Sequence, residues 1–227
     1  MRFTLRVWRQ RDVGSRGSLQ THEIDGISPE MSTLDVLDRL NEKLMREGQE
    51  PVAFERGCGK GSCGACSIVV DGRPYGAACQ QRMSGFRDGA TVVVEPFRAR
   101  AFPVVKDLIV DRSALDNILL SASRVDDRCT GCGACVAACP NASAMLFAAA
   151  NAPLEGEAHA ERDANLLAMV RTHDAAGFGS CSGERVCQEV CPKGIRVERI
   201  ALLNSEHLRA GLREKGTAPA RGGRDSD

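Results

Sequence analysis

The chain has 227 residues, which is enough for one or two domains with cores of their own. Its 30 Lys and Arg balance its 30 Asp and Glu, and aromatic residues make up only 4%. Because it offers neither a basic face nor many rings on which bases stack, we expect no nucleic-acid partner.

Eleven cysteines lie in three tight groups. A secreted disulfide framework would have an even count, a shorter chain and a signal peptide. The first ten residues carry charges throughout, and no stretch approaches the 18 apolar residues of a membrane span. We therefore expect a reduced compartment in which the cysteines hold metal.

The first hundred residues predict a small sheet with one helix. Alternating apolar residues over 2–9 indicate a half-buried strand, and a second strand follows at 18–25. Ser32 and Asp35 form a capping-box pattern that begins an amphipathic helix, which ends near Gly48. With further strands before Asp71-Gly72 and at 92–95, residues 1–100 predict a β-grasp ferredoxin domain of four or five strands.

The first cysteine group has the spacing of a plant-type 2Fe–2S site. Its four glycines, Gly57, Gly59, Gly61 and Gly64, allow a backbone with positive φ to fold around a cluster, with amides that can point at the sulfides of that cluster. A Walker A loop or a dinucleotide fingerprint does not fit these cysteine-rich turns. The four predicted ligands are Cys58, Cys63, Cys66 and Cys79.

The second and third groups are two runs in one register. The first reads C-x2-C-x2-C-x3-C-P from Cys129, and the second, from Cys181, has Glu184 in one cysteine slot. In two-cluster ferredoxins the fourth cysteine of each run binds the other cluster. This rule predicts two ligand sets: a 4Fe–4S cluster on Cys129, Cys132, Cys135 and Cys191, and a 3Fe–4S cluster on Cys139, Cys181 and Cys187.

The second half predicts helices around these runs. The apolar spacing changes to a helical period after residue 101, and it indicates helices at 113–122, 141–152, around 166–170 and over 197–212. The polar residues 155–163 predict an exposed connection. We expect a helical domain over 101–215 and a flexible tail over 216–227. The fold class is α+β, a β-grasp plant-type ferredoxin domain followed by an α-helical bacterial two-cluster ferredoxin-like domain.

Other chemistry fits less well. A zinc-stabilised interaction module would place four ligands in two pairs, and no single zinc site explains eleven cysteines. The four histidines show no ligand spacing, and we assign no catalytic residue. For Glu184 two interpretations stay open: it fills the place of an absent ligand, or its carboxylate holds a fourth iron, for which it is a harder and poorer ligand than thiolate.

The order of the three cluster motifs resembles the iron–sulfur subunits of succinate dehydrogenase and fumarate reductase, the respiratory complex II family. The resemblance covers about residues 3–212. The stretches that carry it are Arg56-Gly-Cys-Gly-Lys-Gly-Ser-Cys-Gly-Ala-Cys66, Phe102-Pro-Val-Val-Lys-Asp-Leu-Ile-Val-Asp-Arg112, Cys135-Val-Ala-Ala-Cys-Pro-Asn141, Gly177-Phe-Gly-Ser-Cys181 and Cys191-Pro-Lys-Gly194.

The resemblance implies an electron-transfer subunit that acts only in a complex. It implies a flavoprotein partner with covalent FAD that interconverts succinate and fumarate. It also implies a membrane-anchor cytochrome b partner with haem b and a quinone, which we expect to be menaquinone. Electrons would pass between FAD and quinone through the 2Fe–2S, 4Fe–4S and 3Fe–4S clusters, at the cytoplasmic face of the inner (plasma) membrane. The direction of turnover stays open.

One departure concerns the quinone end. Many members of the family have a tryptophan soon after the first Cys-Pro and a histidine after the first cysteine of the second run, where this chain has 141–144 and Ser182. The resemblance therefore predicts a quinone site built more from an anchor subunit. The nearest alternative is the iron–sulfur subunit of a thiol–fumarate or heterodisulfide-type reductase, which usually adds CCG repeats that do not follow Cys191 here.

Overall fold

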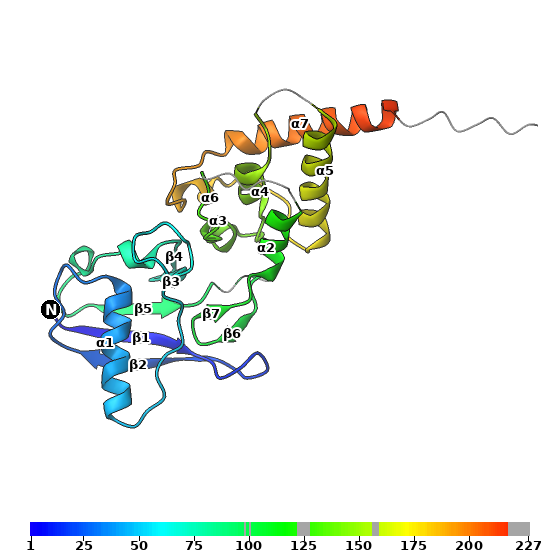
Figure 1. The fold of residues 1–227 in the computed structure, drawn as a ribbon. Helices are drawn as coiled ribbons and strands as arrows, with labels where there is room; N and C mark the ends of the chain where they lie inside the picture. The colour runs from blue at the N-terminus through cyan, green and yellow to red at the C-terminus, as the bar shows by residue number, and fades with distance from the viewer. Residues whose placement is uncertain (98, 100, 122–127, 156–158, 218–227) are drawn as a thin grey trace, which may run out of the picture.

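A five-stranded sheet with one helix packed on it forms the N-terminal part of the computed structural model (Figure 1). The structure describes residues 1–97, 99, 101–121, 128–155 and 159–217. The strand order is β2-β1-β5-β3-β4, in which β1 and β5 are parallel and the other pairs are antiparallel. The elements of this part are β1 Phe3–Arg9, β2 Ser18–Ile24, α1 Thr33–Arg46, β3 Ile68–Val70, β4 Arg73–Tyr75 and β5 Thr91–Glu95, with 3-10 turns at Ala78–Gln80 and Met83–Gly85.

Local sequence signals explain these elements. Ser32 caps α1, and the capping box with Asp35 is present in both directions. Asp71 and Gly72 both have positive φ, as a tight two-residue hairpin between β3 and β4 requires. The inward residues of β1 and the leucines of α1 close one apolar core, so the predicted β-grasp fold is confirmed.

A short hairpin follows the sheet and was not predicted. It consists of β6 Val104–Lys106 and β7 Ile109–Val110. Leu108 at its tip is buried in the core of the sheet, whereas Phe102 just before it is buried in the core of the helical part. Runs of three and two strand residues are too short for alternation to be recognised in sequence.

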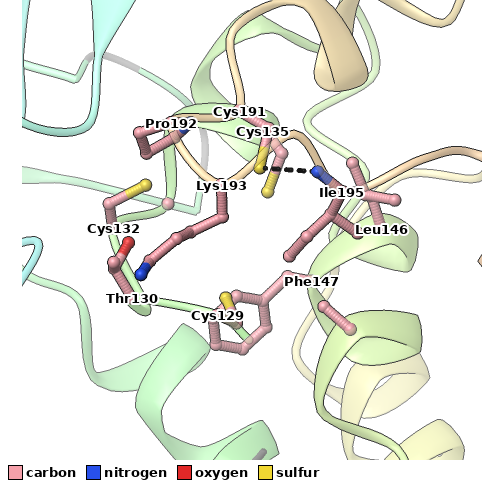
Figure 2. Close-up of a pocket in the computed structure, with 12 residues that line it drawn as sticks. Cys129, Thr130, Cys132, Cys135, Leu146, Phe147, Cys191, Pro192, Lys193 and Ile195 are labelled. Atoms are coloured by element: carbon pink, nitrogen blue, oxygen red, sulfur yellow. Dashed lines mark hydrogen bonds between the residues drawn. The ribbon is translucent and has the colours of Figure 1, made fainter. Parts of the chain in front are cut away.

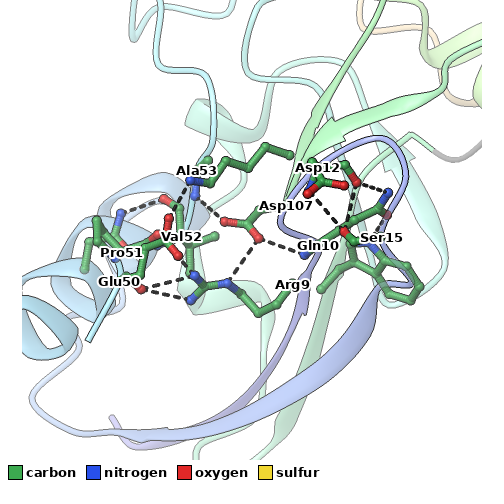
Figure 3. A network of polar contacts seen from close by, with 12 residues as sticks. Arg9, Gln10, Asp12, Ser15, Glu50, Pro51, Val52, Ala53 and Asp107 are labelled. Carbon is green, nitrogen blue, oxygen red and sulfur yellow. Dashed lines mark hydrogen bonds and ion pairs between the residues drawn. The ribbon is translucent and has the colours of Figure 1, made fainter.

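Asp107 fastens this hairpin to the sheet (Figure 3). Its buried carboxylate accepts hydrogen bonds from Arg9 Nε at 3.2 Å, Gln10 N at 2.9 Å and Ala53 N at 2.8 Å. Arg9 also donates to the carbonyl of Glu50 at 3.1 Å. The carboxylate thus joins the end of β1, the loop after α1 and the hairpin.

Helices form the C-terminal part around a second apolar core. They are α2 Ser113–Leu120, α3 Ala134–Ala138, α4 Met145–Asn151, α5 Ala160–Ala175, α6 Val186–Glu189 and α7 Glu198–Thr217. The predicted helix over 141–152 is shorter than expected, because Ala142 adopts a left-handed φ of 49° and α4 starts only at Met145. Within the described ranges no helix has the length and apolarity needed to cross a bilayer.

The prediction of an exposed connection over 155–163 is wrong at its C-terminal end. His159 caps α5, and Arg162 and Asp163 are buried where α5 packs on α7. Arg162 donates to Glu206 at 3.0 Å, and Arg213 donates to Asp163 at 2.9 Å. Buried charges are tolerated when they are paired in this way, so a polar run here faces a partner helix rather than solvent.

Two expectations fall partly beyond the described residues. Ala122, predicted at the end of α2, and 218–227 of the predicted tail lie outside them. The division at residue 100 stays a prediction.

Candidate metal centres

The first cysteine group forms a loop whose sulfurs receive backbone hydrogen bonds. Cys58 Sγ accepts from Lys60 N and Ser62 N, each at 3.3 Å, and from Ser62 Oγ at 3.2 Å. Cys63 Sγ accepts from Cys58 N at 3.3 Å. Amides of this loop therefore point at the sulfur atoms of Cys58 and Cys63, two of the predicted ligands.

The four thiols of this group have different surroundings. Cys58 and Cys63 are exposed, whereas Cys66 and Cys79 are buried. The hydrogen bond from the Ser62 hydroxyl, with the two amides, lowers the pKa of Cys58 to about 6. Burial raises the pKa of Cys66 to about 11. Hydrogen bonds to the charged form thus prepare Cys58 as a thiolate, which is the form that binds metal.

The glycines of this loop have two separate functions. Gly59, Gly61 and Gly64 adopt positive φ, as predicted. Gly57 does not, and it is required for space, because a Cβ on it would lie 2.5 Å from Cys63 Sγ. The backbone at Gly57 thus lies so close to the Cys63 sulfur that a methyl group would not fit between them. Such close packing of backbone around the sulfurs fits a loop that binds a cluster.

Four cysteines from both runs line one small cavity, partly open to solvent (Figure 2). Its other walls include the apolar side chains of Leu146, Phe147 and Ile195, and Lys193 extends across it toward Thr130. Amides donate to two of the sulfurs, Gly131 N to Cys129 at 3.3 Å and Ile195 N to Cys191 at 3.4 Å. The four cysteines are Cys129, Cys132, Cys135 and Cys191.

The chemistry of this donor set fits a metal cluster. Burial and the neighbouring Cys132, Cys129 and Cys191 raise the pKa of Cys135 well above its ordinary value. Neighbouring thiolates repel one another, so simultaneous deprotonation of all these thiols becomes favourable only when bound cations neutralise their charges. No group of three or more His, Cys, Asp or Glu among the described residues is spaced for a single metal ion.

The remaining three cysteines meet where the two runs touch. Cys139 ends α3, Cys187 lies on α6, and these two helices pack together. After burial, the charges of Cys139 and Cys181 are the main neighbours that raise the pKa of Cys187. The stretch from Cys181 to Arg185 is exposed. This end of the molecule is therefore open to a partner.

A close backbone contact holds these runs together. A Cβ on Gly179 would lie 1.9 Å from the carbonyl oxygen of Asn141. Asn141 Nδ2 also donates to the carbonyl of Ser180 at 3.2 Å. Asn141 follows Cys139-Pro140 and Ser180 precedes Cys181, so this contact sets the distance between the two runs.

The loop of the first cysteine group, or first centre, touches the loop that carries Cys129, Cys132 and Cys135, or second centre. Ser67 Oγ donates to the carbonyl of Gly64 at 2.6 Å and to that of Cys132 at 2.9 Å. Arg112 donates to the carbonyls of Gly64 and Gly131, the former at 3.1 Å. A Cβ on Gly76 would lie 2.3 Å from Cys132 Sγ. Sequence reasoning missed these residues, because their partners lie tens of residues away.

Comparisons with known proteins agree with this geometry. A family model described as "2Fe-2S iron-sulfur cluster binding domain" matches residues 4–117, about half the chain, and one described as "4Fe-4S dicluster domain" matches 126–195.

Curated relatives cover most of the chain. The chain is 27% identical to the succinate dehydrogenase iron-sulfur subunit of Bacillus subtilis over 70% of this chain and 74% of that protein. It is 27% identical to the fumarate reductase iron-sulfur subunit of Wolinella succinogenes over 88% of this chain and 95% of that protein.

A solved structure has the same fold. A chain of the Mycobacterium smegmatis Sdh1 complex in the apo form superposes with a TM-score of 0.62 at 23% identity, covering 96% of this chain and 98% of that chain. The two cluster-binding domain models match this chain one after the other, and the named relatives are iron–sulfur subunits. The chain therefore belongs to the family of iron–sulfur subunits of succinate dehydrogenase and fumarate reductase.

Proposed function

We propose that this chain is the electron-transfer subunit of a succinate dehydrogenase or fumarate reductase, an oxidoreductase complex. The observation that carries the proposal is the meeting of Cys129, Cys132 and Cys135 with Cys191 at one cavity, across 55 or more intervening residues in the chain. Cluster ligation in the two-run pattern gives such an arrangement a function. The names of the relatives supply the reaction.

The proposed ligand sets are those that the cysteine spacing predicts. They are Cys58, Cys63, Cys66 and Cys79 for 2Fe–2S, Cys129, Cys132, Cys135 and Cys191 for 4Fe–4S, and Cys139, Cys181 and Cys187 for 3Fe–4S. The clusters would supply one-electron transfer between a flavin and a quinone. The chain's own residues would position them: amides and the Ser62 hydroxyl donate to cysteine sulfur, and Leu146 and Phe147 line the second site with apolar side chains.

The partners follow from the same proposal. A flavoprotein with FAD would dock near the exposed Cys58 loop, where the predicted 2Fe–2S cluster lies. A membrane-anchor cytochrome b with haem b, and a quinone that we take to be menaquinone, would meet the exposed Cys181 end. We propose a peripheral position on the cytoplasmic face of the membrane. Because Ser182 stands where many relatives have histidine, anchor residues would form much of the quinone site.

Metal and sulfide analysis of the purified complex tests the proposal. We expect about nine irons per chain of this subunit, with matching acid-labile sulfide and no stoichiometric zinc. EPR should give a signal from the oxidised protein for the three-iron cluster and a further signal on reduction for the 2Fe–2S cluster. Two or more zinc ions without labile sulfide would instead support the zinc-stabilised interaction module.

A further inference from the structure

The two cysteine runs share a backbone conformation at one particular slot. In the first run Cys132 stands between Gly131 and Gly133, whose φ angles are 67° and 77°. Gly133 is the N-cap of α3, the short helix that carries Cys135. The loop thereby presents Cys132 between two left-handed residues, at the edge of the cavity in Figure 2.

The second run repeats this arrangement around Glu184. Gly183 before it has φ of 80°, and Arg185 after it has φ of 62°. Arg185 is the N-cap of α6, the short helix that carries Cys187. Glu184 therefore occupies the position that Cys132 occupies in the first run, both in sequence register and in local backbone conformation.

Arg185 makes this repetition informative. An arginine rarely adopts left-handed φ, because its Cβ then crowds the backbone. Strained conformations of this kind persist where the surrounding structure requires them, often at binding sites. The loop thus has the same shape as the loop around Cys132, even though no glycine favours that shape at position 185.

The Glu184 carboxylate is also available. The residue is exposed, and among the described residues it makes no hydrogen bond or ion pair. The neighbouring cysteine, Cys181, is exposed as well, and it lies close enough to Cys187 for their charges to interact. Carboxylate oxygen is a hard ligand that binds ferrous iron more weakly and more reversibly than thiolate does.

We propose that Glu184 is a fourth iron ligand at the centre of Cys139, Cys181 and Cys187, and that it makes this centre able to bind one exchangeable Fe²⁺. The proposal rests on the proposed function, because it requires a three-iron cluster on these cysteines. The co-reactant is aqueous ferrous ion. The Fe²⁺ loses water ligands and gains a carboxylate oxygen and cluster sulfides, no bond within Glu184 breaks, and no electron is transferred in the binding step. Binding is favoured once the cluster has accepted one electron, because the added negative charge attracts the cation.

Titration of the anaerobic, reduced complex with ferrous ion tests this. We expect the intact protein to bind about one further iron per subunit chain after desalting, and the parallel-mode EPR signal of its reduced three-iron cluster to disappear in step with that uptake. The variant Glu184→Gln should keep the signal and bind the added iron at least tenfold more weakly. Glu184→Cys should retain the fourth iron after reoxidation and treatment with a chelator.

A matched control removes an acid of the same exposed region. Glu189 ends α6, is exposed, and lies outside the repeated loop. Glu189→Gln should therefore titrate like the unaltered protein. Equal iron uptake by the unaltered protein and Glu184→Gln would overturn the inference, and so would a three-iron signal that ferrous ion never changes. In both cases a total near nine irons before titration would leave the proposed function standing, whereas absence of labile sulfide would remove both.

Discussion

Two thiols eight residues apart in one loop show how local surroundings act on identical side chains. Cys58 is exposed and its sulfur accepts three hydrogen bonds, which lower its pKa to about 6. Cys66 is buried, and burial raises its pKa to about 11. The exposed side of the loop thus stabilises negative charge by hydrogen bonds, whereas on the buried side burial opposes it.

Removal of one of these hydrogen bonds should change the reduction potential of the first centre. Ser62→Ala deletes the hydroxyl that donates to Cys58 at 3.2 Å. Reduction adds negative charge, so a lost donor should lower the potential; a bond of about 1 kcal/mol corresponds to roughly 40 mV for one electron. Potentiometric EPR of the 2Fe–2S signal measures the shift. Ser62→Thr, which keeps the hydroxyl at an exposed position, is the control, and an unchanged potential in Ser62→Ala would contradict the expectation.

Among the elements, the β6–β7 hairpin is too short to be stable by its own strand pairing, and the side chain of Asp107 stabilises it. Asp107 accepts bonds from two backbone amides and from Arg9. These donors come from the end of β1 and from the loop after α1, so one carboxylate ties three segments together (Figure 3).

Asp107→Ala should destabilise the sheet part by about 3 kcal/mol, because it leaves a partly buried arginine and two amides without their acceptor. Denaturant unfolding followed by circular dichroism measures this change in free energy. Asp116→Ala, at an exposed position of α2, should change it by less than about 0.5 kcal/mol. Similar values for the two variants would show that the Asp107 network does not stabilise the hairpin.

The contact between Gly179 and Asn141 sets the distance between the two cysteine runs at the proposed three-iron centre. Gly179→Ala would place a methyl group 1.9 Å from a backbone oxygen, so the two runs must separate. We expect loss of the three-iron EPR signal with the 2Fe–2S signal retained. Gly211→Ala in α7, where nothing lies within 4 Å of the added methyl group, should leave both signals intact. Retention of the three-iron signal in Gly179→Ala would mean that the loop yields without moving the ligands.

At the scale of the whole molecule, two apolar cores are joined through the loops that hold the first and second centres. Ser67 and Arg112 bridge those loops by hydrogen bonds to backbone carbonyls. Gly76 lets the β4 end approach Cys132. The rate of electron transfer between two centres depends on the distance between them. These contacts fix that distance for the first and second centres.

Arg112→Ala should loosen this junction. Loss of charged hydrogen bonds worth about 2 kcal/mol would raise local opening roughly thirtyfold. Hydrogen–deuterium exchange of peptides that contain Gly64 and Gly131 measures the opening. We also expect the second cluster to enhance the spin relaxation of the reduced 2Fe–2S EPR signal less than it does in the unaltered protein. Arg112→Lys, which keeps the charge but not the two-pronged donor, should give an intermediate result, and unchanged exchange in Arg112→Ala would rule out a bridging function.

Much of this protein is determined by the sequence alone, because the relevant signals are local. Cysteine spacing predicted cluster motifs, the Ser32 capping box predicted the start of α1, and Asp71-Gly72 predicted the β3–β4 turn. Each signal depends on residues within a few positions of one another, where chain geometry leaves few alternatives. The ligand assignment itself stays a prediction.

Only the tertiary structure decided the features that depend on distant partners. The burial of Arg162 and Asp163 follows from their pairing with Glu206 and Arg213 on α7. The link between the centres through Arg112, and the need for glycine at position 179, arise from segments that meet only after folding. Such contacts depend on the packing of whole elements, which no local pattern of residue types encodes.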